Sequence, residues 1–373
     1  MPYFDSGELK FTTPGYNRNL GIFVLDDSIT IAPMSVDEAL ELLTEILDGF
    51  CFLDIVDFSR ALAYLLTMLL RLIIGESRTM MFLVDANRQG AGKDYLLGLA
   101  FLIFTGLIPC FYPPCNHDEE WRKRIMAGLI ACERFILISN QKGHLDCGAL
   151  EHTLTSPYVT DRILGKSENI TLPNTAIYGI SGNDLTFSED MARRICHIRL
   201  EFYAEDQKSR VFKYPDLYSH VLSNRSKILS ALMSLIVNWA AKGCPKGRKI
   251  PSFVQWSETV GGIITCCGMP DPFGDRTKIT PAMETGGSRE DKNLKLLVEQ
   301  WHIQYGAEPV IAAYLRSIAD EAGLFGWMNL TERSDQVKFS KMLTQRANRE
   351  IGNWCLKVDT AGKTNRFFLE DIR

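Results

Sequence analysis

A candidate phosphate-binding loop lies in the stretch ANRQGAGKDYLL. Nucleotide loops of the pattern G-x-x-x-x-G-K-[ST] have a glycine and a lysine where this chain has Gly92 and Lys93. Asn87 stands at the first glycine of that pattern, and Asp94 replaces the hydroxyl residue that normally touches magnesium. Glycines such as Gly90 let consecutive backbone N–H groups point inward at a helix N-terminus, where the helix dipole favours an anion. The stretch therefore predicts a phosphate cradle, provided that Asn87 adopts the left-handed backbone that asparagine reaches more easily than most residues.

Asp94 changes how such a loop would hold a nucleotide. A carboxylate beside a triphosphate is repulsive unless a cation lies between them, and bound magnesium would make Asp94 a ligand. The segment RFILIS ends at Ser139, followed by Asn140, where a site of this kind needs an acid. One hypothesis is that Asp94 and Ser139 exchange roles around one magnesium ion, and the other is that the site binds nucleotide but hydrolyses it poorly. A plainer alternative is a glycine turn before a core helix, with Lys93 in solvent.

Polar residues at two later segment ends suit a hydrolytic site. The run AIYGISGND reaches Asn183, and an asparagine at a strand tip between the loop strand and RFILIS can orient an attacking water. Arg193 and Arg194 end a short helical segment before another strand, where an arginine can reach the γ-phosphate of a neighbouring subunit. The alternative for this pair is a solvated helix end that complements the helix dipole.

The elements that must position these residues alternate between short apolar runs and helices. Strands are predicted for RTMMFLVDA, RFILIS, NTAIYGIS and RICHIRLEF, and helices for GKDYLLGLAFLIFTG and EEWRKRIMAGLIAC. A rhythm of strand, loop, helix and strand indicates an α/β fold with a parallel sheet.

The order of elements divides the chain into five parts. Residues 206–267 are mainly helical and suit a small lid, and residues 268–291 are rich in Pro, Gly and charge, as in a linker. Helices closed by two strands around a Gly-containing turn suggest a C-terminal winged helix. The predicted parts are an N-terminal segment (1–50), an α/β nucleotide-binding core (51–205), the helical lid (206–267), the linker (268–291) and a winged-helix-like domain (292–373).

Bulk properties exclude several classes of protein. A formal net charge of −4 in 373 residues excludes binding to nucleic acid by overall positive charge, so any such contact must be local. Ten scattered cysteines without a CxxC pair, and no secretory signal at the start, indicate a cytoplasmic chain with free thiols. Cys110, Cys115 and His117 are conceivable metal ligands, but their spacing fits no standard zinc site and favours loop residues. The apolar run at 61–75 carries Arg71 and is shorter than the ~20 residues of a membrane span, so it predicts a buried helix and no membrane partner.

Together these motifs resemble the AAA+ ATPases, and most closely the helicase portion of primase-helicases and replication proteins of prophages and mobile elements. The resemblance covers roughly residues 50–260, from DANRQGAGKDYL through DRILGKSENITLPNTAIYGISGNDLTFSEDMARRICHIRLEF to NRSKILSALMSLIVNWAAKGCP. That family is related to superfamily 3 and minichromosome-maintenance helicases, which form rings that translocate on DNA. The resemblance implies ATP and Mg²⁺ as cofactors, Asn183 as sensor 1, Arg193 or Arg194 as the arginine finger and Arg225 as sensor 2. The nucleotide-binding residues that it implies are Asn87, Gly90, Ala91, Gly92, Lys93, Asp94, Tyr95 and Arg225.

The same resemblance implies partners and a function. The segment DRILGKSENITLP corresponds to a hairpin that projects into the channel of related rings, where Lys166 and Arg162 would contact DNA phosphates; a plain surface hairpin is the alternative. In that family GKD is a familiar variant, whereas an aspartate usually occupies the position of Ser139. The implied function is an ATP-dependent DNA helicase or translocase in replication of a prophage or mobile element, which forms a homo-oligomer with a hexameric ring as the expected form. Any primase would be a separate chain or have been lost. Two alternatives stay open, namely an ATP-binding assembly or loader protein with weak or no hydrolysis, and a DNA-binding regulator that uses chiefly its winged helix.

Overall fold

The computed structural model describes most of the chain in two compact units. The units are Met1–Ile279 and Thr280–Arg373, and each is treated by itself. The boundary between them falls within residues 268–291, the segment with the composition of a linker. The described residues are 1–25, 29–87, 90–115, 117–163, 168–183, 185–201, 213–274, 289–325, 330–348, 350–351, 354–360, 362 and 365–372.

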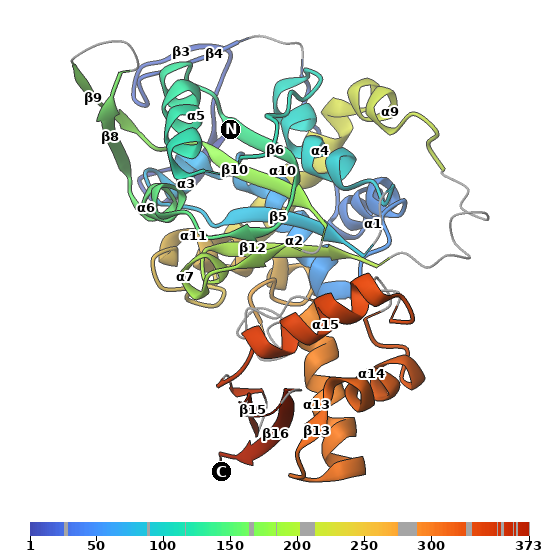
Figure 1. Cartoon of the computed structure of the whole chain (residues 1–373). Helices are drawn as coiled ribbons and strands as arrows, with labels where there is room; N and C mark the ends of the chain where they lie inside the picture. The colour runs from blue at the N-terminus through green and yellow to red at the C-terminus, as the bar shows by residue number, and fades with distance from the viewer. Residues whose placement is uncertain are drawn as a thin grey trace. The chain divides into compact units, whose positions relative to one another are not determined.

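A parallel four-stranded sheet forms the centre of the first unit (Figure 1). Its strands lie in the order β12-β5-β10-β6, and all three pairings are parallel. Strands covered on both faces read as continuous apolar runs, which is why the four segments were recognisable. The predicted α/β fold with a parallel sheet is therefore confirmed. The strands are β5 (Met81–Ala86), β6 (Phe135–Gln141), β10 (Ile177–Gly182) and β12 (Ile195–Leu200).

Helices cover this sheet and share its core. Helix α4 packs against β5, β10 and β6, α2 packs against β12, and α10 and α11 pack against α1 and α2. The helices of residues 206–267, expected to form a lid, thus contribute to the same continuous apolar core as the sheet. The helices are α1 (Val36–Leu47), α2 (Ile55–Thr67), α3 (Arg71–Ile74), α4 (Lys93–Thr105), α5 (Asp118–Ile130), α6 (Gly148–Thr155), α7 (Glu189–Ala192), α9 (Leu217–Ser223), α10 (Arg225–Ala241) and α11 (Val254–Cys266).

The apolar run at 61–75 does not form the single buried helix that was expected. It forms the end of α2, which stops at Thr67, and the separate turn of α3. Arg71 is buried at the start of α3 and donates a hydrogen bond to the Ser77 carbonyl at 2.8 Å, and burial lowers the pKa of Arg71 to about 10. Among the described residues, no helix is long and apolar enough to cross a membrane.

Short strands complete the first unit. The hairpin β8–β9 is antiparallel and pairs Arg162 with Asn169, and β7 pairs with β11 in parallel. The remaining strand pairs lie near the N-terminus and are antiparallel. The short strands are β1 (Pro2–Asp5), β2 (Glu8–Phe11), β3 (Gly15–Asn17), β4 (Ile22–Val24), β7 (His144–Leu145), β8 (Tyr158–Arg162), β9 (Asn169–Pro173) and β11 (Thr186–Phe187).

The second unit combines helices with a small antiparallel sheet of order β13-β16-β15-β14. Its core is formed around fully buried aromatic side chains such as Trp301, Phe339 and Phe367. Helices followed by a hairpin, β15–β16, agree with the predicted order of elements. The elements are α13 (Arg289–Tyr305), β13 (Val310–Ile311), α14 (Ala312–Glu321), α15 (Arg333–Gln345), β14 (Glu350–Ile351), β15 (Trp354–Asp359) and β16 (Arg366–Asp371).

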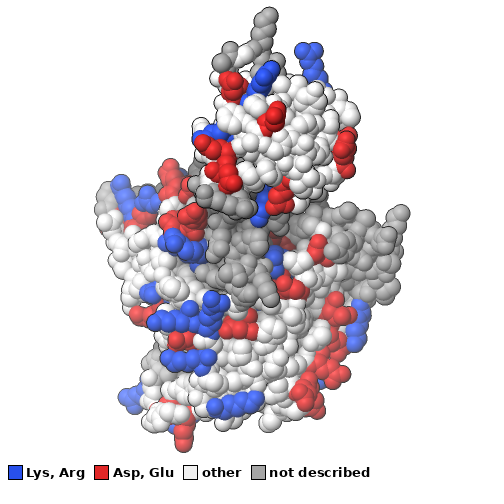
Figure 2. Space-filling model, turned by 90° about the horizontal axis from the view of Figure 1, so that it is seen from below, with Lys and Arg blue, Asp and Glu red and all other residues white. Residues whose placement is uncertain are grey.

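Surface charge is mixed. On the face drawn in Figure 2, Lys and Arg side chains are interspersed with Asp and Glu. This distribution agrees with the formal net charge of −4. A contact with nucleic acid on this face would therefore depend on local groups of side chains.

Candidate nucleotide-binding site

The glycine loop joins the carboxyl end of β5 to the first turn of α4. Gly90 and Gly92 have φ values of 79° and 86°, a region that favours glycine. Gly92 is the N-cap of α4, and no side chain caps the helix there. The first N–H groups of α4 have no partner within the helix, so this end of the helix suits an anion.

Asn87 does not have the conformation that the sequence argument required. It is not among the described residues with positive φ, and its N–H instead donates to the Leu200 carbonyl at 3.4 Å, next to the end of β12. The expectation of a left-handed Asn87 is therefore wrong. The chain continues the strand pairing for one residue beyond β5, so the glycines that follow provide the turn.

Lys93 lies inside the site and not in solvent. The residue is buried, with 7% of its surface exposed, and its Nζ donates to Asn183 Oδ1 at 2.7 Å. Asn183 directly follows β10, which lies between β5 and β6. Because the carboxyl ends of parallel strands meet at one edge of a sheet, residues 90 positions apart converge there. The alternative of a solvent-exposed Lys93 is wrong.

Asp94 accepts a hydrogen bond from the hydroxyl group of Ser181. The Oγ of fully buried Ser181 donates to Asp94 Oδ1 and accepts from the Asn140 N–H at 3.0 Å. The pairing of β6 with β10 shifts its register between Ile180 and Gly182, and Asn140 takes a left-handed φ of 55°. This irregularity is a local bulge at the end of β6.

Ser139 is therefore not the partner of Asp94. Its N–H donates to the Tyr112 carbonyl at 3.1 Å, and Asn140, not Ser139, faces the site. The predicted exchange of roles between Asp94 and Ser139 around a magnesium ion stays a prediction, and the contact that the structure shows is between Asp94 and Ser181. The described end of β6 presents no carboxylate at this place.

These groups enclose a cavity of about 440 Å³. Its walls carry two lysines, Lys93 and Lys142, against one carboxylate, Asp94. A cationic cavity at a helix N-terminus suits a polyphosphate. The lining residues are Gly90, Gly92, Lys93, Asp94, Tyr95, Asn140, Lys142 and Asn183.

Tyr218 supports the cavity from α9 and had no signal in the sequence. Its hydroxyl donates to the carbonyls of Asp94 and Tyr95 at 3.3 and 3.2 Å, and its ring lies 4.9 Å from the exposed ring of Tyr95. Burial raises the pKa of Tyr218, so the hydroxyl stays a donor. Ala91 is buried beneath the loop. Tyr95 offers an exposed aromatic face at the cavity wall.

Arg225 lies far from these groups. Its guanidinium donates to the carbonyls of Ile103 and Phe104 at 2.8 and 2.7 Å, at the C-terminal end of α4. Helix α4 has 13 residues, so about 20 Å separates its two ends. Arg225 thus complements the negative end of the helix dipole. The structure does not bring it to the nucleotide site, contrary to the expectation for sensor 2.

Arg193 and Arg194 lie at the amino ends of the strands, whereas the glycine loop follows the carboxyl end of β5. The Arg194 carbonyl accepts from the N–H of Met81, the first residue of β5, and both arginines contact Asp190. A six-residue strand spans about 20 Å, so neither arginine reaches the cavity of its own chain. A role toward a neighbouring subunit stays a prediction.

The remaining expected residues lie elsewhere. Arg162 ends β8 on the exposed hairpin, and Lys166 falls outside the described residues, so DNA contact by this hairpin stays a prediction. Cys110, Cys115 and His117 belong to no metal-binding group, because the described part of the chain has no cluster of three His, Cys, Asp or Glu side chains suited to a metal ion. All ten cysteines are free thiols.

Known proteins were compared with the chain. No protein-family model matches it, and no curated protein sequence is significantly similar to it. Among solved structures, an apo form of the C-terminal region of NrS-1 aligns with 99% of this chain and 82% of its own at 14% identity, with a TM-score of 0.43. The SCCmec type IV Cch active helicase aligns with 94% of this chain and 73% of its own at 10% identity, with a TM-score of 0.33. JCV helicase aligns with 70% and 72% at 12% identity, with a TM-score of 0.25. These similarities are loose, and the site is interpreted below from its own residues.

Proposed function

We propose that this chain is an ATP-dependent DNA helicase or translocase that assembles as a ring and acts in replication of a prophage or mobile element. The observation that carries the proposal is the buried Lys93, whose Nζ lies 2.7 Å from Asn183 Oδ1 beside the glycine loop. Lys93 neutralises the β- and γ-phosphates of ATP, and Asn183 orients the attacking water. Strands β5 and β10 are far apart in the sequence but adjacent in the sheet. Lys93 and Asn183, which follow these strands, therefore share one site.

The Asp94 carboxylate, which lines the cavity, fits a magnesium ion. Mg²⁺ prefers oxygen ligands, with one or two protein carboxylates beside the phosphates. The ion, when bound, would offset negative charge on the phosphates. Asp94 would hold it, and Ser181 fixes the carboxylate by donating to Oδ1.

The ring is proposed from the place of Arg194. Since this arginine lies about 20 Å from its own cavity, it serves the cavity of a neighbouring copy, as arginine fingers do. A hexamer is the expected form, with DNA contacted by Arg162 and Lys166 and primase supplied by a separate chain. The second unit has the helix and strand order of a winged helix, which we propose as its fold.

A second candidate function is an ATP-binding assembly or loader protein without productive turnover. One observation favours it: Ser139 and Asn140 stand at the end of β6, where no carboxylate is available to polarise water. In this case ATP would hold subunits together, and Arg194 would only sense it.

Steady-state ATP hydrolysis with magnesium, with and without single-stranded DNA, separates the two functions. Lys93→Ala is the blank, and Lys246→Ala is the matched control because Lys246 is exposed and pairs with Glu258 at 2.9 Å. The helicase proposal expects turnover that rises with DNA in the wild type and the control and disappears in the blank. Tight ATP binding with no turnover above the blank would instead support the loader.

Mixing two inactive variants tests the ring. Arg194→Ala should bind ATP but not hydrolyse it, while Lys93→Ala should not bind it. In mixed rings some interfaces combine an intact Lys93 with an intact Arg194 from the next subunit, so about a quarter of wild-type turnover should return at equal mixing. Normal turnover by Arg194→Ala alone would show that the arginine has another role.

A further inference from the structure

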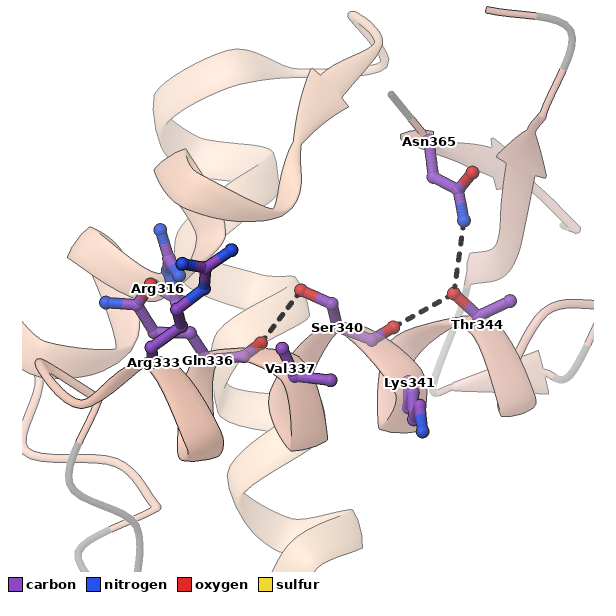
Figure 3. A pocket seen from close by; sticks show the side chains of 8 residues that line it. All are labelled: Arg316, Arg333, Gln336, Val337, Ser340, Lys341, Thr344 and Asn365. Atoms are coloured by element: carbon purple, nitrogen blue, oxygen red, sulfur yellow. Dashed lines mark hydrogen bonds between the residues drawn. The ribbon is translucent and has the colours of Figure 1, made fainter. Parts of the chain in front are cut away.

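A polar groove of about 540 Å³ crosses the surface of the second unit. It runs along the outer face of α15 and is bounded by Arg316 from α14 and by Asn365 just before β16 (Figure 3). Helix α15 buries Phe339 and Met342 on its inner face. The side chains on its outer face therefore do not pack in the core.

The groove carries positive charge without matching negative charge. Among the described residues that line it, Arg316, Arg333 and Lys341 are cationic and none is acidic. In the part of the chain that the structure describes, none of the three has an ion-pair partner. Lys338, on the same helix, pairs with Asp335 at 2.7 Å, so the unit does neutralise cations outside the groove. Cations gathered without carboxylates favour an anionic ligand.

Neutral side chains in the groove already donate hydrogen bonds to backbone carbonyls of the protein. Ser340 Oγ donates to the Gln336 carbonyl at 3.0 Å, and Thr344 Oγ1 donates to the Ser340 carbonyl at 2.9 Å (Figure 3). Gln336 Nε2 donates to the Leu330 carbonyl at 3.2 Å. The donors that remain for a ligand are thus mainly the charged groups, which recognise phosphate and carry little base information.

We infer that this groove binds the phosphate backbone of duplex DNA with little sequence preference. Arg333 and Lys341 are eight positions apart on α15, or about 12 Å along the helix axis. A helix lying against the duplex would therefore bring the two cations to separate phosphates of the backbone. The described lining contains no aromatic side chain on which unpaired bases would stack, and this favours duplex over single-stranded DNA. The choice of DNA rests on the proposed function, whereas the phosphate chemistry of the groove does not.

Fluorescence anisotropy of a labelled duplex of about 20 base pairs, titrated with the full-length chain without nucleotide, tests the inference. The test variant is Arg333→Gln/Lys341→Gln, and the matched control is Lys338→Gln, which removes one charge from the same helix outside the groove. The double variant should bind the duplex at least about tenfold more weakly, and its slope of log K against log salt should fall by about 2. The control should keep the wild-type affinity and slope, and circular dichroism checks that each variant is folded.

Several results would overturn the inference. An unchanged salt slope in the folded double variant would show that these cations do not contact phosphate. A loss confined to single-stranded DNA or to duplex RNA would give the groove another ligand. A changed sedimentation coefficient with unchanged duplex affinity would make it a contact between protein chains. Because the titration contains no nucleotide, failure of the ATPase proposal, read from Lys93→Ala, is seen separately.

Discussion

Replacement of Ser181 by alanine tests the contact that distinguishes this site from the one expected. The Ser181 hydroxyl is fully buried, donates to Asp94 Oδ1 and accepts from the Asn140 N–H at 3.0 Å. Ser181→Ala removes both bonds and leaves the half-buried Asp94 carboxylate without this donor. The first turn of α4, the end of β6 and the end of β10 then lose their common polar contact.

The magnitude follows from the kinds of bond lost. A hydrogen bond to a charged group contributes about 1.5–3 kcal/mol to the free energy of unfolding. Asn140 is exposed, so its N–H can bond to water and adds little. We therefore expect Ser181→Ala to lower the free energy of unfolding of the first unit by about 2 kcal/mol.

Hydrogen exchange of the β10 amides measures this loss in the first unit alone. Ser230→Ala is the matched control, because Ser230 is equally buried but makes only neutral bonds, to the Ser226 carbonyl at 2.7 Å and from the Ala32 N–H at 2.9 Å. It should cost about 1 kcal/mol. A double-mutant cycle with Asp94→Ala isolates the pair, with an expected coupling of at least about 1 kcal/mol. Coupling below about 0.5 kcal/mol would refute the reasoning, because Ser181 and Asp94 would then act independently.

Two further predictions concern buried groups of the first unit. Asp57 is fully buried and bonds Arg60 at 2.6 Å and Arg199 at 2.9 Å. Asp57→Ala should leave the buried Arg60 without its carboxylate, while Arg199 keeps Asp54 at 3.3 Å, and should lower the free energy of unfolding by about 3–5 kcal/mol in urea. Asp190 is the control, because it is exposed and also pairs with arginine. Asp190→Ala should lower the free energy of unfolding much less than Asp57→Ala, and equal losses would contradict the prediction. Burial raises the pKa of the Cys147 thiol to about 12, so at pH 8 roughly one molecule in ten thousand carries the thiolate. Iodoacetamide should therefore alkylate Cys147 after the exposed cysteines, at a rate that rises as the pH approaches 12. Mass spectrometry measures the order of labelling, and early labelling of Cys147 would contradict the prediction. The exposed cysteines that serve as references are Cys110 and Cys132.

Much of the site was predictable because its signals are local. Gly92 and Lys93 lie next to each other in a recognisable spacing, between an apolar strand and a helix, and each of those elements has a pattern within a dozen residues. Asn183 was found for the same reason, since it follows a buried run. Parallel strands then bring such ends together whatever the intervening chain.

The rest depended on contacts that no local pattern contains. The register of β6 against β10 shifts near Asn140, and Ser181, on the neighbouring strand, donates to Asp94, a contact between residues 87 positions apart in the sequence. Tyr218 reaches the loop from a helix more than 120 residues away, and its partners are backbone carbonyls, which any sequence provides. Arg225 has a suitable charge and a suitable helix, but only the packing of α10 on α4 shows which end of α4 it contacts.

The charge balance in the cavity bears on whether Asp94 is a functional residue or a substitution that disables the site. Among the described lining residues, two lysines and one carboxylate give a net charge of +1, whereas ATP carries about four negative charges. A lysine pair with a neutral residue in place of Asp94 would bind bare ATP better, so the carboxylate reduces affinity unless a divalent cation accompanies the nucleotide. Ser181 holds that carboxylate in one orientation through a buried hydroxyl, which a damaged site would not require. If the cavity binds ATP as proposed, the pair would favour the metal complex of the nucleotide over the free anion. This holds for a motor and for a nucleotide-gated clasp alike, and the missing acid at the end of β6 is what separates the two.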